Sequence, residues 1–259
     1  METADRDAYL ARLGFAHPPA PTATALARLQ EAHLMRIPFE NLSIHLDEPI
    51  ELDPAWLVEK LTRRVRGGFC FELNGAFAAL LETLGFDVEL RGARVVETDG
   101  RLRPPLDHLA LVVQCPADDG DARWLADVGF GDSPLWPARL DGGEPVPDPL
   151  GLVELVPATG GDLDLVRAGL LRYRIEPPRR ELEDFVPMCW FHRTSPTSPF
   201  TRQTVCTRRT DGGRITISGN RLIVTENGER TEHDLPDEAA VLAAYAEHFG
   251  IRLDRVPAA

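Results

Sequence analysis

The sequence RGGFCFELN occupies residues 66–74 and places a cysteine where a helix is expected to begin. The two glycines permit a sharp turn, and residues 71–84 carry apolar side chains at helical spacing. Unpaired N–H groups and the macrodipole at a helix start favour an anion, so we expect this position to favour a Cys70 thiolate. The alternative is that Cys70, between two phenylalanines, is simply a small buried hydrophobic residue.

The pattern around this stretch changes along the chain from helical to extended. Apolar spacing predicts helices on its N-terminal side, at residues 5–13 and 22–35 and after the capping pair Asp53-Pro54. Strands are predicted afterwards, at residues 88–96, 109–115, 124–130, 152–156, 163–166 and 171–175. Further strands within 204–225 and a last helix at 236–249 complete the chain. This order predicts an α+β protein in which the strands form a barrel or a curled antiparallel sheet.

Composition and charge restrict the classes of partner. The 259 residues include 41 acidic and 28 basic side chains, which give a net charge of −13. Such a surface repels polyanions, so nucleic acid is not an expected partner, although local N–H groups and arginines could still hold a small anion. The N-terminus has no basic start followed by an apolar stretch, and no window is long enough for a membrane span, so we expect a cytoplasmic protein. Its four cysteines show no paired spacing and are expected to be free thiols.

A nucleophilic cysteine needs a base and a group that orients that base. His108 opens the apolar run at residues 109–113, which places its ring at the rim of a sheet, and His192 is the second candidate. Asp127 interrupts a predicted strand, where a buried charge is costly unless it is paired. Asp107 is a weaker candidate for the acid, because consecutive strand residues point to opposite faces. The residues alone leave the choice of base open.

The glycine pair around Phe130 forms a second candidate feature. Gly129 and Gly131 flank the ring directly after the predicted strand, and their N–H groups are not shielded by a Cβ atom. A pyrophosphate could bind there, although short glycine patterns also occur in plain turns. We expect no metal site, because the cysteines and histidines lack ligand spacing.

Several motifs together resemble the arylamine N-acetyltransferases in order and spacing. They are Arg36-Ile37-Pro38-Phe39-Glu40-Asn41-Leu42, residues 66–74, His108-Leu109, Asp127-Val128-Gly129-Phe130-Gly131, and later Ser195-Pro196-Thr197-Ser198-Pro199-Phe200-Thr201 and Gly213-Arg214-Ile215-Thr216. The resemblance therefore extends over nearly the whole chain. It implies a helical domain at residues 1–87, a β-barrel domain at 88–200 and an α/β lid at 201–259, with a papain-like catalytic core.

The resemblance also implies a reaction and a set of site residues. Acetyl-CoA would acetylate Cys70, and an arylamine or arylhydrazine would then take the acetyl group with His108 and Asp127 completing a catalytic triad. Gly129, Phe130 and Gly131 would bind the CoA co-substrate. The acceptor pocket would be lined by Phe130 together with Phe39 and Phe200. The implied role is xenobiotic metabolism; the natural acceptor and the oligomeric state are left open.

Three other functions share parts of this pattern. A macrolactam-forming amide synthase would use the same triad on a polyketide thioester, and the triad cannot separate it from an acetyltransferase. A papain-like peptidase or transglutaminase would have the same order of cysteine, histidine and aspartate. A noncatalytic binding module on this scaffold would leave Cys70 with an ordinary thiol.

Overall fold

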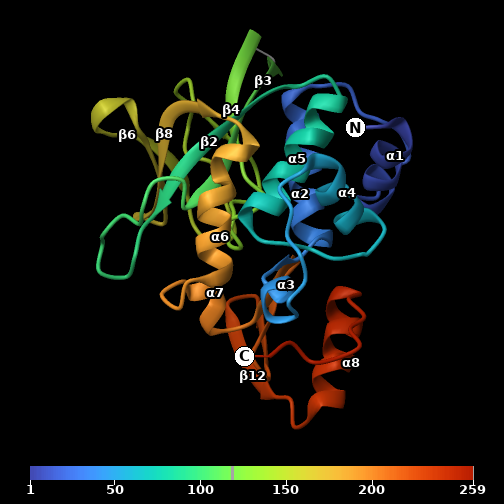
Figure 1. The fold of residues 1–259 in the computed structure, drawn as a ribbon. Helices are drawn as coiled ribbons and strands as arrows, with labels where there is room; N and C mark the ends of the chain where they lie inside the picture. The colour runs from blue at the N-terminus through green and yellow to red at the C-terminus, as the bar shows by residue number, and fades with distance from the viewer. Residues whose placement is uncertain (118–119, 259) are drawn as a thin grey trace.

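The computed structural model describes residues 1–117 and 120–258 (Figure 1). Helices come first, a seven-stranded sheet follows, and a second sheet with a closing helix ends the chain. This order confirms the expected α+β class. Figure 1 shows the N-terminal helices on one side of the larger sheet and the C-terminal elements below both.

The N-terminal helices pack around the helix that carries the cysteine. They are α1 (Thr3–Arg12), α2 (Ala23–Arg36), α3 (Leu42–His45), α4 (Pro54–Thr62) and α5 (Cys70–Thr83). Two predicted starts are confirmed by caps: Thr22 accepts a hydrogen bond from the N–H of Ala25, and Asp53 accepts one from that of Trp56. The apolar faces of α1, α2, α4 and α5 and one face of the larger sheet form the largest core, and α5 is buried from its first turn onward.

The larger sheet is antiparallel throughout and strongly curled. Its strands are β2 (Asp87–Val95), β3 (His108–Ala117), β4 (Gly120–Ala126), β5 (Ala138–Arg139), β6 (Val153–Pro157), β7 (Leu163–Arg167) and β8 (Leu170–Arg180). They lie in the order β5-β4-β3-β2-β8-β7-β6, and the two end strands lie beside each other. The sheet therefore forms a nearly closed barrel with its own apolar interior.

The second sheet combines a short strand from the N-terminal part of the chain with strands from the C-terminal part. It contains β1 (Phe39–Glu40), β9 (Val205–Thr210), β10 (Gly213–Ser218), β11 (Arg221–Glu226) and β12 (Glu229–Asp234), in the order β1-β9-β10-β11-β12. Helix α8 (Glu238–Phe249) packs on it, and α6 (Val186–Thr194) and α7 (Pro199–Arg202) connect it to the barrel. Short 3-10 turns occur at Thr159–Gly161 and Leu182–Phe185. The division into three domains at residues 87 and 200 stays a prediction. Strand β1, from the first predicted domain, pairs with β9, from the third.

One expectation about local structure was wrong, and two elements of the structure were not expected. The strand expected at residues 124–130 ends at Ala126, because the next N–H groups leave the ladder: that of Asp127 donates to Gln30, and that of Gly129 donates to the Asp127 carboxylate. Strand β12 and helix α6 were not predicted. All six residues of β12 are exposed, so its sequence has no apolar alternation.

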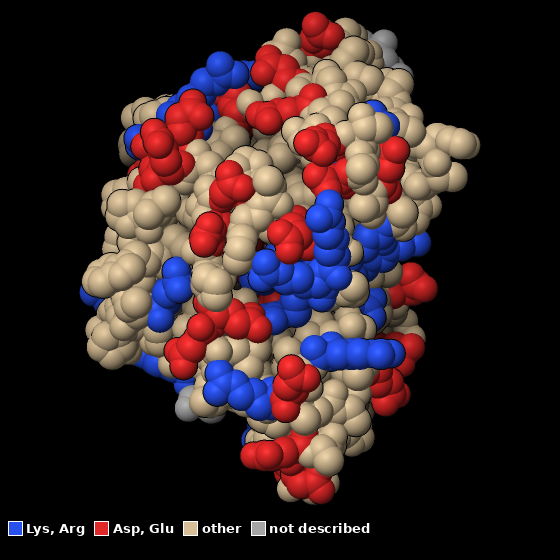
Figure 2. Space-filling view, turned by 45° about the vertical axis from the view of Figure 1, so that its right-hand side comes forward, with Lys and Arg blue, Asp and Glu red and all other residues tan. Residues whose placement is uncertain are grey.

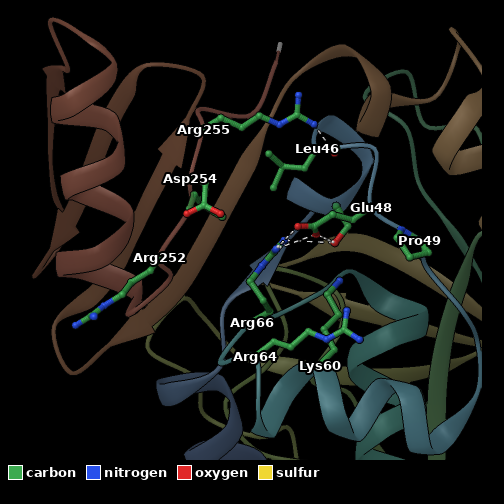
Figure 3. A pocket seen from close by; sticks show the side chains of 11 residues that line it. Leu46, Glu48, Pro49, Lys60, Arg64, Arg66, Arg252, Asp254 and Arg255 are labelled. Carbon is green, nitrogen blue, oxygen red and sulfur yellow. Dashed lines mark hydrogen bonds and ion pairs between the residues drawn. The ribbon is translucent and has the colours of Figure 1, made fainter.

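Buried ion pairs support the turn that leads into α5. Arg66 binds Glu40 at 2.9 Å and Lys60 binds Glu72 at 2.5 Å. Arg66 also binds the half-buried Glu48 at 2.9 Å (Figure 3). A cavity of about 420 Å³ opens over this network. The two buried cations, Arg66 and Lys60, already have carboxylate partners. The network therefore fixes the backbone beside the cysteine and leaves no unpaired buried cation to bind an anion.

The buried carboxylate of Glu40 is expected to make stability fall in acid. Burial alone would raise its pKa, but the charges of Arg66 and Lys60, together with hydrogen bonds from Arg66 and from the Leu42 N–H, lower it from 4.5 to about 2. A depressed pKa stabilises the folded state above the unfolded value and loses that effect as the pH falls through the folded value. Urea unfolding should therefore show a falling free energy between pH 4.5 and 2.

The contribution of Glu40 can be separated from that of the other carboxylates by two variants. Glu40→Gln should reduce the pH slope, whereas the matched change Glu144→Gln, at an exposed position, should not. An unchanged slope in Glu40→Gln would mean that the buried pair does not govern acid stability.

The molecular surface is unevenly charged. Figure 2 shows acidic side chains scattered over most of one face and basic side chains gathered in a band across its middle. The net charge of −13 is thus compatible with local positive regions. Within the described residues, no helix combines the length and apolarity needed to span a membrane.

Candidate active site

Cys70 is the first residue of α5, as expected, and it lies beside the start of β3. The turn before it requires glycine, because a side chain at Gly67 would collide with the carbonyl oxygen of Pro38. Glu72 fixes the helix start by accepting the Phe69 N–H at 3.2 Å. The backbone N–H of Leu109 donates a hydrogen bond to Cys70, so the cysteine contacts the residue next to His108.

Burial opposes the thiolate that the helix start was expected to favour. Cys70 is only 4% exposed. Burial raises the pKa of its thiol well above the ordinary value, and the charges of Asp107 and Asp127 add to this, whereas the Leu109 N–H acts against it. The helix start alone therefore does not give a thiolate, and a neighbouring base must accept the proton.

His108 and Asp127 form a buried pair. The Nε2 atom of His108 lies 2.9 Å from Oδ2 of Asp127, and both side chains are 2% exposed. Since a carboxylate oxygen only accepts, Nε2 carries the proton in the neutral imidazole and Nδ1 is left as the acceptor. This tautomer is the one that can take a proton from a neighbouring thiol.

The Asp127 carboxylate is fully hydrogen-bonded. Besides His108, it accepts bonds from Asn74 Nδ2 at 2.9 Å, the Gly129 N–H at 2.8 Å and the Tyr173 hydroxyl at 2.8 Å. Burial alone would raise the pKa of Asp127, but His108 and these hydrogen bonds lower it. Burial and the Asp127 charge raise the pKa of Tyr173 well above its usual range, so its hydroxyl stays a donor. Asp127 is therefore an ionised, fixed acceptor for the imidazole.

Asn74 links helix α5, the start of β3 and the segment that follows β4, although the sequence predicted no role for it. It lies one turn after Cys70, and its Nδ2 atom also donates to the Leu109 carbonyl at 2.6 Å. Its Oδ1 atom accepts the Val128 N–H at 2.9 Å. A buried asparagine inside an apolar helix requires hydrogen-bond partners. The asparagine within the apolar pattern of residues 71–84 was therefore the sequence signal for a structural role of Asn74. Tyr173 gave no signal, because an aromatic residue in a strand is ordinary.

Gly129 is tightly packed against the start of α5. A Cβ atom there would lie 2.8 Å from the Cα and 2.9 Å from the carbonyl oxygen of Cys70, and backbone atoms cannot yield cheaply. We expect Gly129→Ala to lower the free energy of unfolding by about 1–3 kcal/mol through overpacking, as measured by urea denaturation. Gly143→Ala is the control, because Gly143 is exposed and its Cβ atom would meet only the side chain of Arg139, at 3.1 Å, and no backbone atom. Equal stability of the two variants would contradict the close contact.

Aromatic side chains surround the triad in two groups. The half-buried Phe130 ring lies 5.4 Å from that of His108, measured between ring centroids. Phe39 and Phe200 are 5.9 Å apart, and Phe200 also contacts Phe69, the residue before Cys70, at 5.6 Å. The three phenylalanines expected at the acceptor pocket thus all lie near residues of the candidate site.

The remaining candidates of the sequence analysis lie outside the triad. His192 does not bind Asp127; its Nε2 atom lies 3.4 Å from Oδ1 of Asp107. Cys115, Cys189 and Cys206 are free and buried. In the parts of the chain that the structure describes, no group of three or more histidine, cysteine, aspartate or glutamate residues could hold a metal ion.

Comparisons with known proteins agree with this geometry. A family model described as N-acetyltransferase matches residues 22–257. The chain is 38% identical to the arylamine N-acetyltransferase of Mycolicibacterium smegmatis over 261 residues, which cover 96% of this chain and 92% of that protein. The structure of the Salmonella typhimurium enzyme superimposes with a TM-score of 0.87 at 31% identity, covering 99% of this chain and 94% of the other.

A second solved structure contains a bound molecule. The Mycobacterium marinum arylamine N-acetyltransferase in complex with CoA superimposes with a TM-score of 0.84 at 31% identity, covering 94% of this chain and 92% of that one. Similarity of this extent over nearly the full length confirms the resemblance found in the sequence. The chain belongs to the arylamine N-acetyltransferase family and is an acyltransferase.

Proposed function

We propose that the protein transfers the acetyl group of acetyl-CoA to the nitrogen of an arylamine or arylhydrazine through an acetyl-cysteine at Cys70. The observation that carries this proposal is the buried pair of His108 and Asp127, at 2.9 Å, beside a cysteine at a helix start. Family membership and the CoA complex of the Mycobacterium marinum relative support the choice of donor.

The reaction would proceed in two displacements. In the first, Nδ1 of His108 takes the Cys70 proton, the thiolate attacks the acetyl carbonyl, and the CoA sulfur leaves with the proton from His108. In the second, the amine nitrogen attacks the thioester, His108 receives its proton, and the Cys70 sulfur departs. Asp127 keeps the imidazole in the accepting tautomer and stabilises the imidazolium in both steps. N–H groups of the first helical turn would stabilise the oxyanion.

The binding residues follow the same proposal. An aromatic acceptor would stack against Phe130, beside His108, and against the walls formed by Phe39 and Phe200. Gly129 and Gly131 would lie along the CoA pyrophosphate. Gly129 is packed against Cys70. CoA would therefore contact the turn at residues 129–131 mainly through Phe130 and Gly131, which are both half-buried.

An assay of CoA release tests the proposed function. Free CoA thiol should appear continuously only when both acetyl-CoA and an arylamine or hydrazine are present, and the initial rates should follow double-displacement kinetics. Absence of acetylation for a panel of aryl acceptors, with the protein folded, would contradict it and favour the amide synthase alternative. The relatives reported above are all arylamine N-acetyltransferases, which supports acetyl transfer instead.

A further inference from the structure

A second buried carboxylate lies beside Cys70. Asp107 directly precedes His108 and is 4% exposed. Burial raises the pKa of the Cys70 thiol most, and the negative charges of Asp107 and Asp127 raise it further, as does Cys189 on α6. The nucleophile therefore faces two carboxylates, of which only Asp127 has a role in the mechanism above.

Asp107 has two partners that the mechanism does not use. Nε of Arg103 lies 3.2 Å from its Oδ1 atom. Arg103 itself is fixed by its backbone: its N–H donates to the Val95 carbonyl at 2.9 Å, and its carbonyl accepts from Arg94 Nε at 2.7 Å. The backbone at Arg103 is therefore fixed, and its largely buried guanidinium lies beside the carboxylate as an ion pair.

His192 reaches the same carboxylate from helix α6. Its Nε2 atom lies 3.2 Å from the Asp107 carbonyl oxygen and 3.4 Å from Oδ1, so this nitrogen must be the protonated donor. The ring packs against Phe69 and Phe71, the two neighbours of Cys70, at centroid distances of 6.3 and 5.9 Å. His192 thus contacts both the carboxylate and the segment that carries the nucleophile.

We propose, resting on the proposed role of Cys70 as nucleophile, that Arg103 and His192 are positioning residues that hold and neutralise Asp107 so that the Cys70 thiolate can form. Each carboxylate near the sulfur then has its own partner: His108 for Asp127, and Arg103 with His192 for Asp107. Arg103 supplies the compensating charge, and His192 holds the residue through the Asp107 backbone carbonyl while its Nε2 atom also lies 3.4 Å from the carboxylate. An unpaired Asp107 in this buried position would repel the thiolate strongly.

The test is the rate of Cys70 alkylation by iodoacetamide as a function of pH, with the adduct located by peptide mass spectrometry. Arg103→Gln should shift the midpoint of the profile upward by about one pH unit and slow alkylation about tenfold at pH 7, because the unpaired carboxylate opposes the thiolate. Adding Asp107→Asn to this variant should restore the rate to within about threefold of the parent protein. Arg101→Gln, which removes an exposed pair with Asp99, should leave the profile unchanged.

The outcomes separate this proposal from a structural role and from the proposed function. An unchanged profile in Arg103→Gln, or a double variant no faster than Arg103→Gln, would overturn the proposal. If Arg103→Gln does not fold, Asp107→Asn alone decides, since it should alkylate at least as fast as the parent and a slower rate would contradict the idea. A parent protein in which Cys70 reacts no faster than Cys115 would refute the proposed nucleophile itself, whatever the variants do.

Discussion

Replacement of Cys70 by alanine is expected to lower kcat/KM for acetyl transfer by at least about 10⁴-fold, because no other side chain can carry the acetyl group between the two substrates. The fold should survive, since alanine fills most of the space of a buried cysteine at a helix start, where it is well tolerated. Steady-state turnover of acetyl-CoA with an aryl acceptor measures the loss, and circular dichroism reports the fold.

Cys115→Ala provides the matched control. Cys115 is also buried, at 3% exposure, but it lies on β3 in the apolar core and away from the triad. This variant should keep its activity within about twofold and lose only modest stability, as small core truncations do. Activity retained in Cys70→Ala, or lost in Cys115→Ala, would show that the nucleophile has been misplaced.

Asp127→Asn is expected to lower kcat about 10³- to 10⁴-fold with little change in the fold. All four neighbours of this carboxylate donate: His108, Asn74, Tyr173 and the Gly129 N–H. An amide offers one accepting oxygen, so its NH₂ group must face two of these donors. When it faces His108, Nε2 has to accept, Nδ1 carries the proton, and the imidazole can no longer take the proton of Cys70.

The control for this change is Asp141→Asn, at a surface ion pair with Arg123. It should leave kcat unchanged, because exposed pairs contribute little. If Asp127→Asn retained more than about a fifth of the parent activity, the orienting role would belong to another residue. A large loss of secondary structure in Asp127→Asn would instead mean that the carboxylate is needed for folding.

Two residues of the candidate site, Cys70 and Asp127, could be proposed from the sequence because their signals are local, whereas the choice of His108 rested on the family resemblance. The glycine pair before Cys70 and the aspartate at the end of an apolar strand are visible without the fold. The partners of that aspartate are not local: Asn74 lies 53 residues before Asp127 and Tyr173 lies 46 residues after it. Only the packing of α5 and β8 around the end of β4 brings them together, so neither partner could be assigned from spacing.

The same distinction applies to the elements of the fold. The helix starts at Thr22 and Asp53 were predicted because capping residues act within one turn. Strand β12 has no apolar face, yet the Asn227-Gly228 pair before it, with φ values of 52° and 86°, forms a two-residue hairpin turn of a kind that the sequence itself indicates. The burial of Cys70 was one of two alternatives that the sequence left open, since elements that cover it, including α6 and β3, come later in the chain.

The central claim is that Cys70 becomes acetylated on the way to the product. Incubation of the protein with acetyl-CoA and no acceptor, followed by acid quenching and peptide mass spectrometry, tests it directly. The account predicts one added acetyl group on the peptide that contains Cys70, which disappears when an arylamine or hydrazine is added and is absent from Cys70→Ala. An acetyl group on any other residue, or an unmodified Cys70 in a protein that turns over acetyl-CoA, would contradict it.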